Sequence, residues 1–131
     1  MADKGGDRIM ELKNRSQYLD KLISVQDMEV IKVVTGIRRC GKSSLLKLMM
    51  AHLREQGVME EQILSMNFES MQFADMDSKS LYQYVMERAP KGKRLYLFLD
   101  EVQKVRDWQD AVNSFRVDLD CDIYVTGSNS K

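Results

Sequence analysis

The stretch GIRRCGKS, residues Gly36–Ser43, decides the fold expected of this chain. It matches the pattern GxxxxGK[ST], in which two glycines, a lysine and a hydroxyl residue stand at fixed spacing. The β-branched run Glu29–Thr35 precedes it and predicts a buried strand. Apolar residues at helical spacing then predict a helix from Lys42 to about Gln56, with Gly57 as its stop. A strand, this loop and a helix in that order form a phosphate-binding loop.

The loop suits a nucleotide because its backbone and side chains offer positive charge to phosphate. Glycines let successive backbone N–H groups turn inward, and the helix N-terminus adds partial positive charge. The ammonium of Lys42 can bridge β- and γ-phosphates, and the hydroxyl of Ser43 can ligate Mg²⁺. We therefore expect ATP and Mg²⁺ to bind here. The residues expected to contact them are Gly36, Ile37, Arg38, Arg39, Cys40, Gly41, Lys42, Ser43 and Ser44.

Three side chains inside the loop have alternative interpretations. Arg38 and Arg39 either add phosphate contacts or lie in a solvated loop tip. The solvated tip is favoured for Arg38, and neither interpretation is favoured for Arg39. Cys40 suits a position that needs a small residue, and an oxidation-sensitive regulatory role is the less favoured alternative.

A pair of acidic residues ends the apolar run LYLFLDE at Leu95–Glu101. Ligands of parallel α/β sheets bind at the carboxyl ends of the strands, where the phosphate loop also lies. Asp100 is therefore the expected metal ligand beside Ser43, and Glu101 is the expected base that orients and deprotonates the attacking water. An ordinary polar strand end is the alternative. A glutamate directly after the aspartate, in a chain without an NKxD motif, favours an ATPase over a GTPase.

The other segments alternate in type along the chain. A helix is expected at residues 15–25, a strand at Gln62–Phe68, a helix at Ser78–Arg88, a helix capped by Asp107, and a last strand at Asp122–Thr126. This alternation predicts an α/β fold, a three-layer αβα P-loop NTPase with a parallel sheet of about four strands. The chain divides into a flexible leader, residues 1–14, and an ATPase core, residues 15–131.

Composition limits the classes of partner. Lys and Arg together number 20, as do Asp and Glu, so the net charge of zero offers no global footprint for nucleic acid or an anionic membrane. A local basic patch is compatible with this net charge, so the composition does not exclude contact between the full-length protein and nucleic acid. The longest apolar run, Leu95–Leu99, is far shorter than the about 20 residues of a spanning helix. Cys40 and Cys121 form no disulfide framework, and a cytoplasmic location is expected.

These motifs resemble AAA+-related ATPases of bacteria and archaea whose phosphate loop reads GxRRxGK[ST]. The stretches that carry the resemblance are NRSQYLDKL, GIRRCGKSSLLK, FLDEVQKVRDWQDAV and YVTGSNS. The resemblance implies that Arg15, and more weakly Asn14 and Tyr18, lie near the nucleotide base or ribose. It also implies the strand order 5-1-4-3-2, with the fifth strand and a helical lid missing from these residues. The first strand is then an exposed edge, which invites self-association.

The resemblance also suggests roles for polar residues at the other strand ends. YVTGSNSK looks like a first sensor of the γ-phosphate or attacking water, with Asn129 as the expected residue and Ser128 as its substitute. A terminal Gly-Ser-Asn turn is the alternative. Asn67 either holds Glu101 inactive until a partner binds or makes an ordinary strand-end hydrogen bond to backbone.

Two residues of functional type are expected to be structural. His52, the sole histidine, is expected on the surface of the first long helix. Trp108 is expected in the core, in one stripe with Ala111, Val112 and Phe115.

The function expected from the sequence is ATP–Mg²⁺ binding and ATP hydrolysis, with Lys42, Glu101 and Asn129 as catalytic residues and weak turnover in these residues alone. The alternative is a nucleotide-dependent switch or scaffold that binds ATP or ADP without significant hydrolysis. A small-molecule kinase is disfavoured, because residues 102–118 read as an amphipathic helix and not as an arginine-bearing lid.

Overall fold

The computed structural model describes residues 18–28, 30–34 and 39–127, and the side chains of Arg39 and Cys40 lie outside this description. Within these residues the sheet has four parallel strands in the order β1-β4-β3-β2. Their bounds are Lys32–Val34 for β1, Ile63–Asn67 for β2, Leu95–Asp100 for β3 and Cys121–Thr126 for β4. This confirms the expected parallel sheet and the expected order of these strands.

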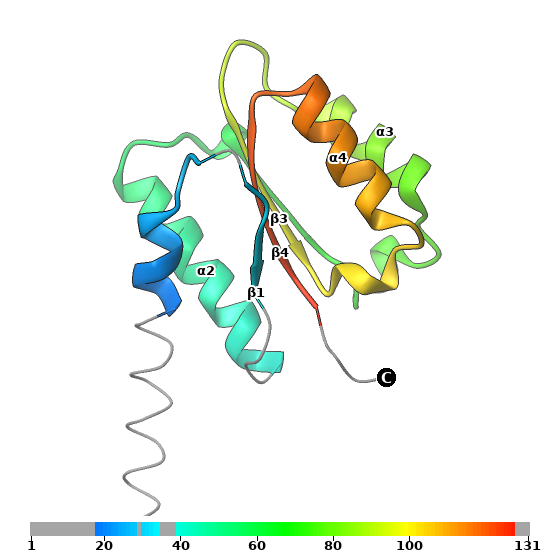
Figure 1. Cartoon of the computed structure of the whole chain (residues 1–131), viewed down its shortest axis with the longest axis horizontal. Helices are drawn as coiled ribbons and strands as arrows, with labels where there is room; N and C mark the ends of the chain where they lie inside the picture. Colours follow the sequence, from blue (N-terminus) through cyan, green and yellow to red (C-terminus); the bar gives the residue numbers. More distant parts are fainter. Residues whose placement is uncertain (1–17, 29, 35–38, 128–131) are drawn as a thin grey trace, which may run out of the picture.

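Helices cover both faces of the sheet (Figure 1). On one face lie residues 18–24, which are helical, and α2 (Arg39–Glu55). On the other face lie α3 (Ser78–Arg88) and α4 (Trp108–Asp118). The chain therefore has the three-layer α/β architecture expected from its alternating elements. No helix in the described part is both long enough and apolar enough to cross a bilayer.

The pleat of β3 divides the core between the two faces. Leu97 and Leu99 pack with α3 and α4, whereas Tyr96 and Phe98 face α2. Phe98 stacks on Tyr124 of the neighbouring strand, with ring centroids 4.8 Å apart. Because both faces are covered, every residue of β3 is buried, as expected of a central parallel strand.

Several element boundaries differ from those expected. α2 begins at Arg39, three residues before the expected start at Lys42, because the first turn of a helix has no apolar periodicity to mark it. The expected strand Gln62–Phe68 loses one residue at each end, to Gln62 in a 3₁₀ turn and to Phe68 after β2. α3 occupies the expected range Ser78–Arg88, and its cap is Asp77, whose carboxylate accepts from the Ser80 N–H at 3.0 Å.

The segment after β3 corrects three expectations. Residues 102–118 are not one helix but a 3₁₀ turn, Val102–Lys104, followed by α4. Asp107 stands at the N-cap position in a left-handed conformation, and its side chain makes no cap hydrogen bond among the described residues. Trp108 is half-buried at the margin of the core, because it occupies the first turn of α4.

His52 of α2, which was expected on the surface, is also half-buried, and its Nε2 is enclosed without a hydrogen-bond partner in the described part of the chain.

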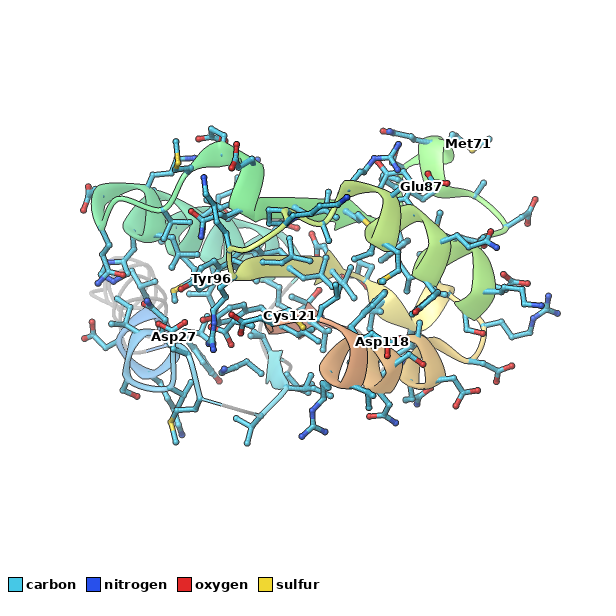
Figure 2. The ribbon with its side chains drawn as sticks, turned by 90° about the horizontal axis from the view of Figure 1, so that it is seen from above. Asp27, Met71, Glu87, Tyr96, Asp118 and Cys121 are labelled. Atoms are coloured by element: carbon cyan, nitrogen blue, oxygen red, sulfur yellow. The ribbon has the colours of Figure 1, made fainter. Side chains whose placement is uncertain are left out.

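A buried polar network holds β1 against β4 at the amino ends of the strands. Lys32 forms an ion pair with Asp122, whose side chain is fully buried. The other oxygen of Asp122 accepts from the Asp27 N–H at 2.9 Å and from the Tyr124 hydroxyl at 2.6 Å. Asp27 in turn accepts from the Tyr96 hydroxyl at 2.8 Å, and both residues are marked in Figure 2. The network therefore anchors the turn before β1 to β3 and β4.

The network shifts the pKa values of its members. Burial raises the pKa of Tyr96 above its ordinary value, and the hydrogen bond to Asp27 adds to the rise. The pKa of Tyr124 is raised by burial and by its bond to Asp122. Burial opposes ionisation of Asp27, but hydrogen bonds from Tyr96 and Gln26 lower its pKa overall. Both phenols thus stay protonated at neutral pH and donate to the side chains of Asp27 and Asp122.

Candidate functional site

The start of α2, the end of β3 and the end of β4 meet at the carboxyl ends of the strands. Ser43, in the first turns of α2, donates its hydroxyl to Asp100 Oδ2 at 2.5 Å. The neighbouring Lys42 is buried, and its Nζ donates to the Gly127 carbonyl, just after β4, at 2.6 Å. One hydrogen bond thus joins Ser43 to Asp100, which is 57 positions away in sequence, and another joins Lys42 to Gly127, which is 85 positions away. The structure brings together the lysine, the hydroxyl and the first carboxylate predicted from the sequence.

Asp100 is held at three points. Its Oδ1 accepts from the Thr126 hydroxyl at 2.5 Å, while Oδ2 accepts from Ser43. Its backbone carbonyl accepts from the Phe68 N–H at 3.0 Å, at the end of β2. Only 6% of Asp100 is exposed. The side chain of Asp100 is therefore fixed by Thr126 of β4 and by Ser43 of α2. Its backbone is fixed by the residue after β2.

Ser43 and Asp100 fit Mg²⁺ by the chemistry of their donors. Both are oxygen ligands, and their oxygens lie a single hydrogen bond apart. Mg²⁺ is usually held by one or two carboxylates together with waters and phosphate oxygens, and not by a complete protein cage. The described residues contain no cluster of three or more His, Cys, Asp or Glu side chains that could hold a metal ion.

Glu101 lies in a tight turn directly after β3. Its backbone is left-handed, with φ 58° and ψ 49°, a conformation that is uncommon for a non-glycine residue. The Glu101 N–H donates to the Thr126 hydroxyl at 2.9 Å, so that Thr126 joins both acidic residues. Only 3% of Glu101 is exposed, and its Oε1 accepts from the Gln103 side-chain amide at 2.8 Å. Glu101 is thus held through its backbone N–H by Thr126 and through its carboxylate by Gln103.

Other expected site residues lie outside the described residues or elsewhere. Gly36, Ile37, Arg38, Arg15, Asn14, Ser128 and Asn129 fall outside the described residues, as do the side chains of Arg39 and Cys40. Ser44 follows Ser43 in α2 and is half-buried. Asn67 accepts from the Glu69 N–H at 3.0 Å, which is the strand-end hydrogen bond to backbone left open as its alternative.

The sequence did not single out Thr126 or Gln103 for the site. Thr126 reads as the last β-branched residue of a buried strand, and Gln103 as a polar residue after the acidic pair. Their roles depend on contacts with Glu101 across a turn and across a strand pair. A polar residue fully buried at a strand end, as Thr126 is, would have been the signal, but burial there follows only from the assembled sheet.

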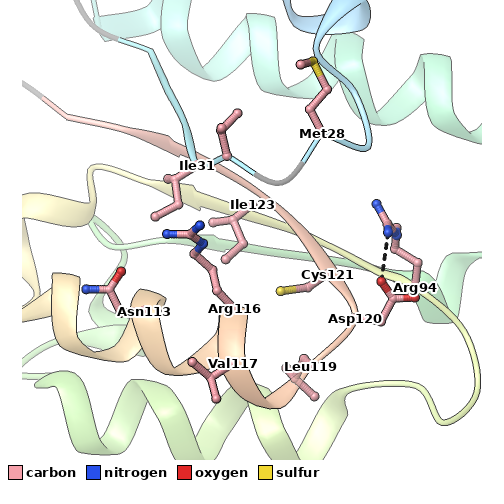
Figure 3. Close-up of a pocket in the computed structure, with 11 residues that line it drawn as sticks. Met28, Ile31, Arg94, Asn113, Arg116, Val117, Leu119, Asp120, Cys121 and Ile123 are labelled. Carbon is pink, nitrogen blue, oxygen red and sulfur yellow. Dashed lines mark ion pairs between the residues drawn. The ribbon is translucent and has the colours of Figure 1, made fainter.

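A separate hollow of about 420 Å³ lies at the amino ends of the strands (Figure 3). Its lining includes Met28, Ile31, Arg116 and Cys121, and Arg94 pairs with Asp120 at its rim at 2.9 Å. Burial raises the pKa of the Cys121 thiol to about 11, so the thiol is protonated at neutral pH. This hollow contains none of the predicted phosphate-binding residues.

A parallel αβα sandwich with a lysine and a hydroxyl at the start of a helix, beside an aspartate at the end of a central strand, defines the P-loop NTPase class. Within that class the chain belongs to the AAA domain family, which matches residues 29–131.

A related chain shares this region. It is an uncharacterized protein of Haemophilus influenzae, 40% identical over 119 residues. The alignment covers 89% of this chain and 30% of that protein, so the chain spans about a third of the relative's length. No solved structure matches the chain significantly.

Proposed function

We propose that this chain binds ATP with Mg²⁺ at the carboxyl ends of β1, β3 and β4 and hydrolyses the γ-phosphate. The observation that supports this most is the hydrogen bond between Ser43 and Asp100, with the buried Lys42 beside it. The hydroxyl and the carboxylate would hold Mg²⁺, which when bound neutralises charge on the phosphate oxygens. Membership of the AAA domain family supports nucleotide binding.

Each protein group has one task in this proposal. Lys42 exchanges its bond to the Gly127 carbonyl for phosphate oxygens. Thr126 keeps Asp100 and Glu101 in fixed relation, since its hydroxyl bonds to both. Glu101 orients the attacking water and takes its proton, for which the enclosed site supplies a region of low dielectric constant.

Removing the ammonium of Lys42 tests nucleotide binding. Lys42→Ala should weaken ATP–Mg²⁺ binding by roughly 10- to 100-fold, because a charge-assisted hydrogen bond contributes about 1.5–3 kcal/mol. Isothermal titration calorimetry measures the affinity. Lys47→Ala is the matched control, since Lys47 lies on the same helix and is exposed. Equal affinity of Lys42→Ala and the parent, with both proteins folded, would refute the proposed site.

A nucleotide-dependent switch is a second candidate function. The burial of Glu101 favours this candidate, because it limits the access of an attacking water to the carboxylate. The two candidates differ in phosphate release. ATP binding accompanied by release of phosphate supports the ATPase, and binding without any release supports the switch.

We further propose that copies of the chain associate through the edge of β1. Among the described strands β1 pairs only with β4, and Val33, the middle residue of this edge strand, is 58% exposed. Val33→Lys should lower the association constant by about 10-fold or more, as a charge opposes pairing at an edge. Sedimentation velocity over a concentration series measures this. Met71→Lys is the control, because Met71 is exposed well away from β1 (Figure 2). Equal association of both variants would exclude this edge.

A further inference from the structure

Gln103 joins the acidic pair to the end of β4. Its Nε2 donates to Glu101 Oε1 at 2.8 Å, and its Oε1 faces Gly127. A Cβ placed on Gly127 would lie only 3.1 Å from that Oε1. The orientation of the amide follows from chemistry, since an ionised carboxylate accepts hydrogen bonds and only the NH₂ end can donate. Gln103 is an exposed residue, but its amide lies between the Glu101 carboxylate and the empty side-chain position of Gly127.

Gly127 is also the residue whose carbonyl accepts from Lys42. Lys42 is thus bonded to Gly127, the Gln103 amide lies next to the empty side-chain position of Gly127, and the same amide is bonded to Glu101. Asn67, which the sequence suggested as the residue that holds Glu101, instead caps the turn after β2. Among the described residues, Gln103 is the side chain seen to bond the Glu101 carboxylate.

We propose that Gln103 is a positioning residue that sets the orientation of the Glu101 carboxylate and makes it depend on what Lys42 contacts. This inference rests on the proposed ATPase function. The backbone of Glu101 is already fixed by Thr126, which leaves the side-chain torsions to be set. The Gln103 amide sets them from one side, and Gly127 limits where that amide can lie.

In this proposal, nucleotide binding changes the first of these contacts, the hydrogen bond from Lys42 to the Gly127 carbonyl. A phosphate that draws Lys42 away from the Gly127 carbonyl removes a contact that holds Gly127 beside Gln103. The Gln103 amide then adjusts, and Glu101 with it. Occupancy of the phosphate loop is in this way communicated to the base across the end of the sheet.

Removal of the amide donor gives the first test. Gln103→Met keeps the length of the side chain and loses the hydrogen bond, so kcat should fall by about 10- to 100-fold, as expected for a base misplaced by about 1 Å. The Kd for ATP–Mg²⁺ should stay within about 2-fold, since the hydrogen bonds of Lys42, Ser43 and Asp100 in the described part of the chain go to residues other than Gln103. Gln109→Met, at an exposed position of α4, is the matched control. An unchanged kcat for Gln103→Met in an active parent would overturn the inference and leave the ATPase proposal standing.

The contact with Gly127 gives a second, independent test. Gly127→Ala should displace the flexible end of Gln103 by a few tenths of an ångström and lower kcat less than Gln103→Met does. Adding Gly127→Ala to Gln103→Met should lower kcat no further, because the displaced group is already gone. Additive effects of the two changes would mean that Gly127 acts by another route, and would overturn the link.

A third measurement does not need turnover. The side-chain amide resonances of Gln103 in an NMR spectrum should shift in Glu101→Gln without nucleotide. They should also shift when ATP–Mg²⁺ is added to the parent, but not when it is added to Lys42→Ala. A parent that binds ATP without moving these resonances overturns the inference, whether or not it releases phosphate. A parent that binds no ATP overturns the proposed function itself, which calorimetry identifies separately.

Discussion

Glu101→Gln is expected to lower the rate of ATP hydrolysis by about 10²- to 10⁴-fold, the usual contribution of a positioned general base. The substitution removes the proton acceptor with little change of shape. A glutamine oxygen can still accept from Gln103, and the backbone N–H can still donate to Thr126. The affinity for ATP–Mg²⁺ should stay within about 2-fold, because the phosphate ligands are untouched. Phosphate release in single-turnover experiments measures the rate, and calorimetry measures the affinity.

The matched control for this change is Glu87→Gln. Glu87 is exposed in the last turn of α3 (Figure 2), and its replacement should leave the rate unchanged. A Glu101→Gln protein that hydrolyses ATP as fast as the parent would show that Glu101 is not the base. ATP binding could then still be correct, since Lys42, Ser43 and Asp100 carry that part of the proposal.

Asp122→Ala is expected to reduce the free energy of unfolding by about 3–5 kcal/mol, because it leaves a buried ammonium without its counter-charge. Lys32 and Asp122 have side-chain exposures of 3% and 0%. The change also takes an acceptor from the Tyr124 hydroxyl and from the Asp27 N–H. Urea denaturation, followed by circular dichroism, measures the loss as a lower midpoint at an unchanged slope.

A surface ion pair provides the comparison for Asp122→Ala. Lys93 and Glu61 pair at 2.6 Å, but their side chains are 41% and 57% exposed. Glu61→Ala should therefore cost no more than about 1 kcal/mol. If the two alanine variants were equally stable, the polar network at the amino ends of the strands would not be what holds β1 in the sheet.

The order of the elements and the main binding residues were predictable because their signals are local. The expected range Ser78–Arg88 for α3 is confirmed, since Asp77 and the apolar spacing mark its start and course. Gly57, with φ 97°, ends the turn after α2 as expected. Lys42, Ser43 and Asp100 meet as expected, because a phosphate loop and the carboxyl end of a parallel strand share one edge of the sheet.

Expectations failed where neighbours in space outweighed local preference. Asp107 stands at the N-cap of α4 as expected, yet its backbone is left-handed and its side chain makes no cap hydrogen bond among the described residues. His52 reads as a surface residue, but it is half-buried within the layer that α2 forms on the sheet. The sequence around Asp107 does not predict a left-handed backbone, and the sequence around His52 does not predict its partial burial.

The sequence by itself determined the class of fold and the identity of the residues that we propose to face a phosphate. A glycine pattern, a lysine and an acidic strand end each specify their chemistry within a few neighbouring positions. Only the tertiary structure decided how Glu101 is held, because Thr126 and Gln103 reach it through a parallel strand pair and a left-handed turn. Hydrogen bonds between elements depend on distances that no sequence spacing encodes, and those distances exist only once both faces of the sheet are covered.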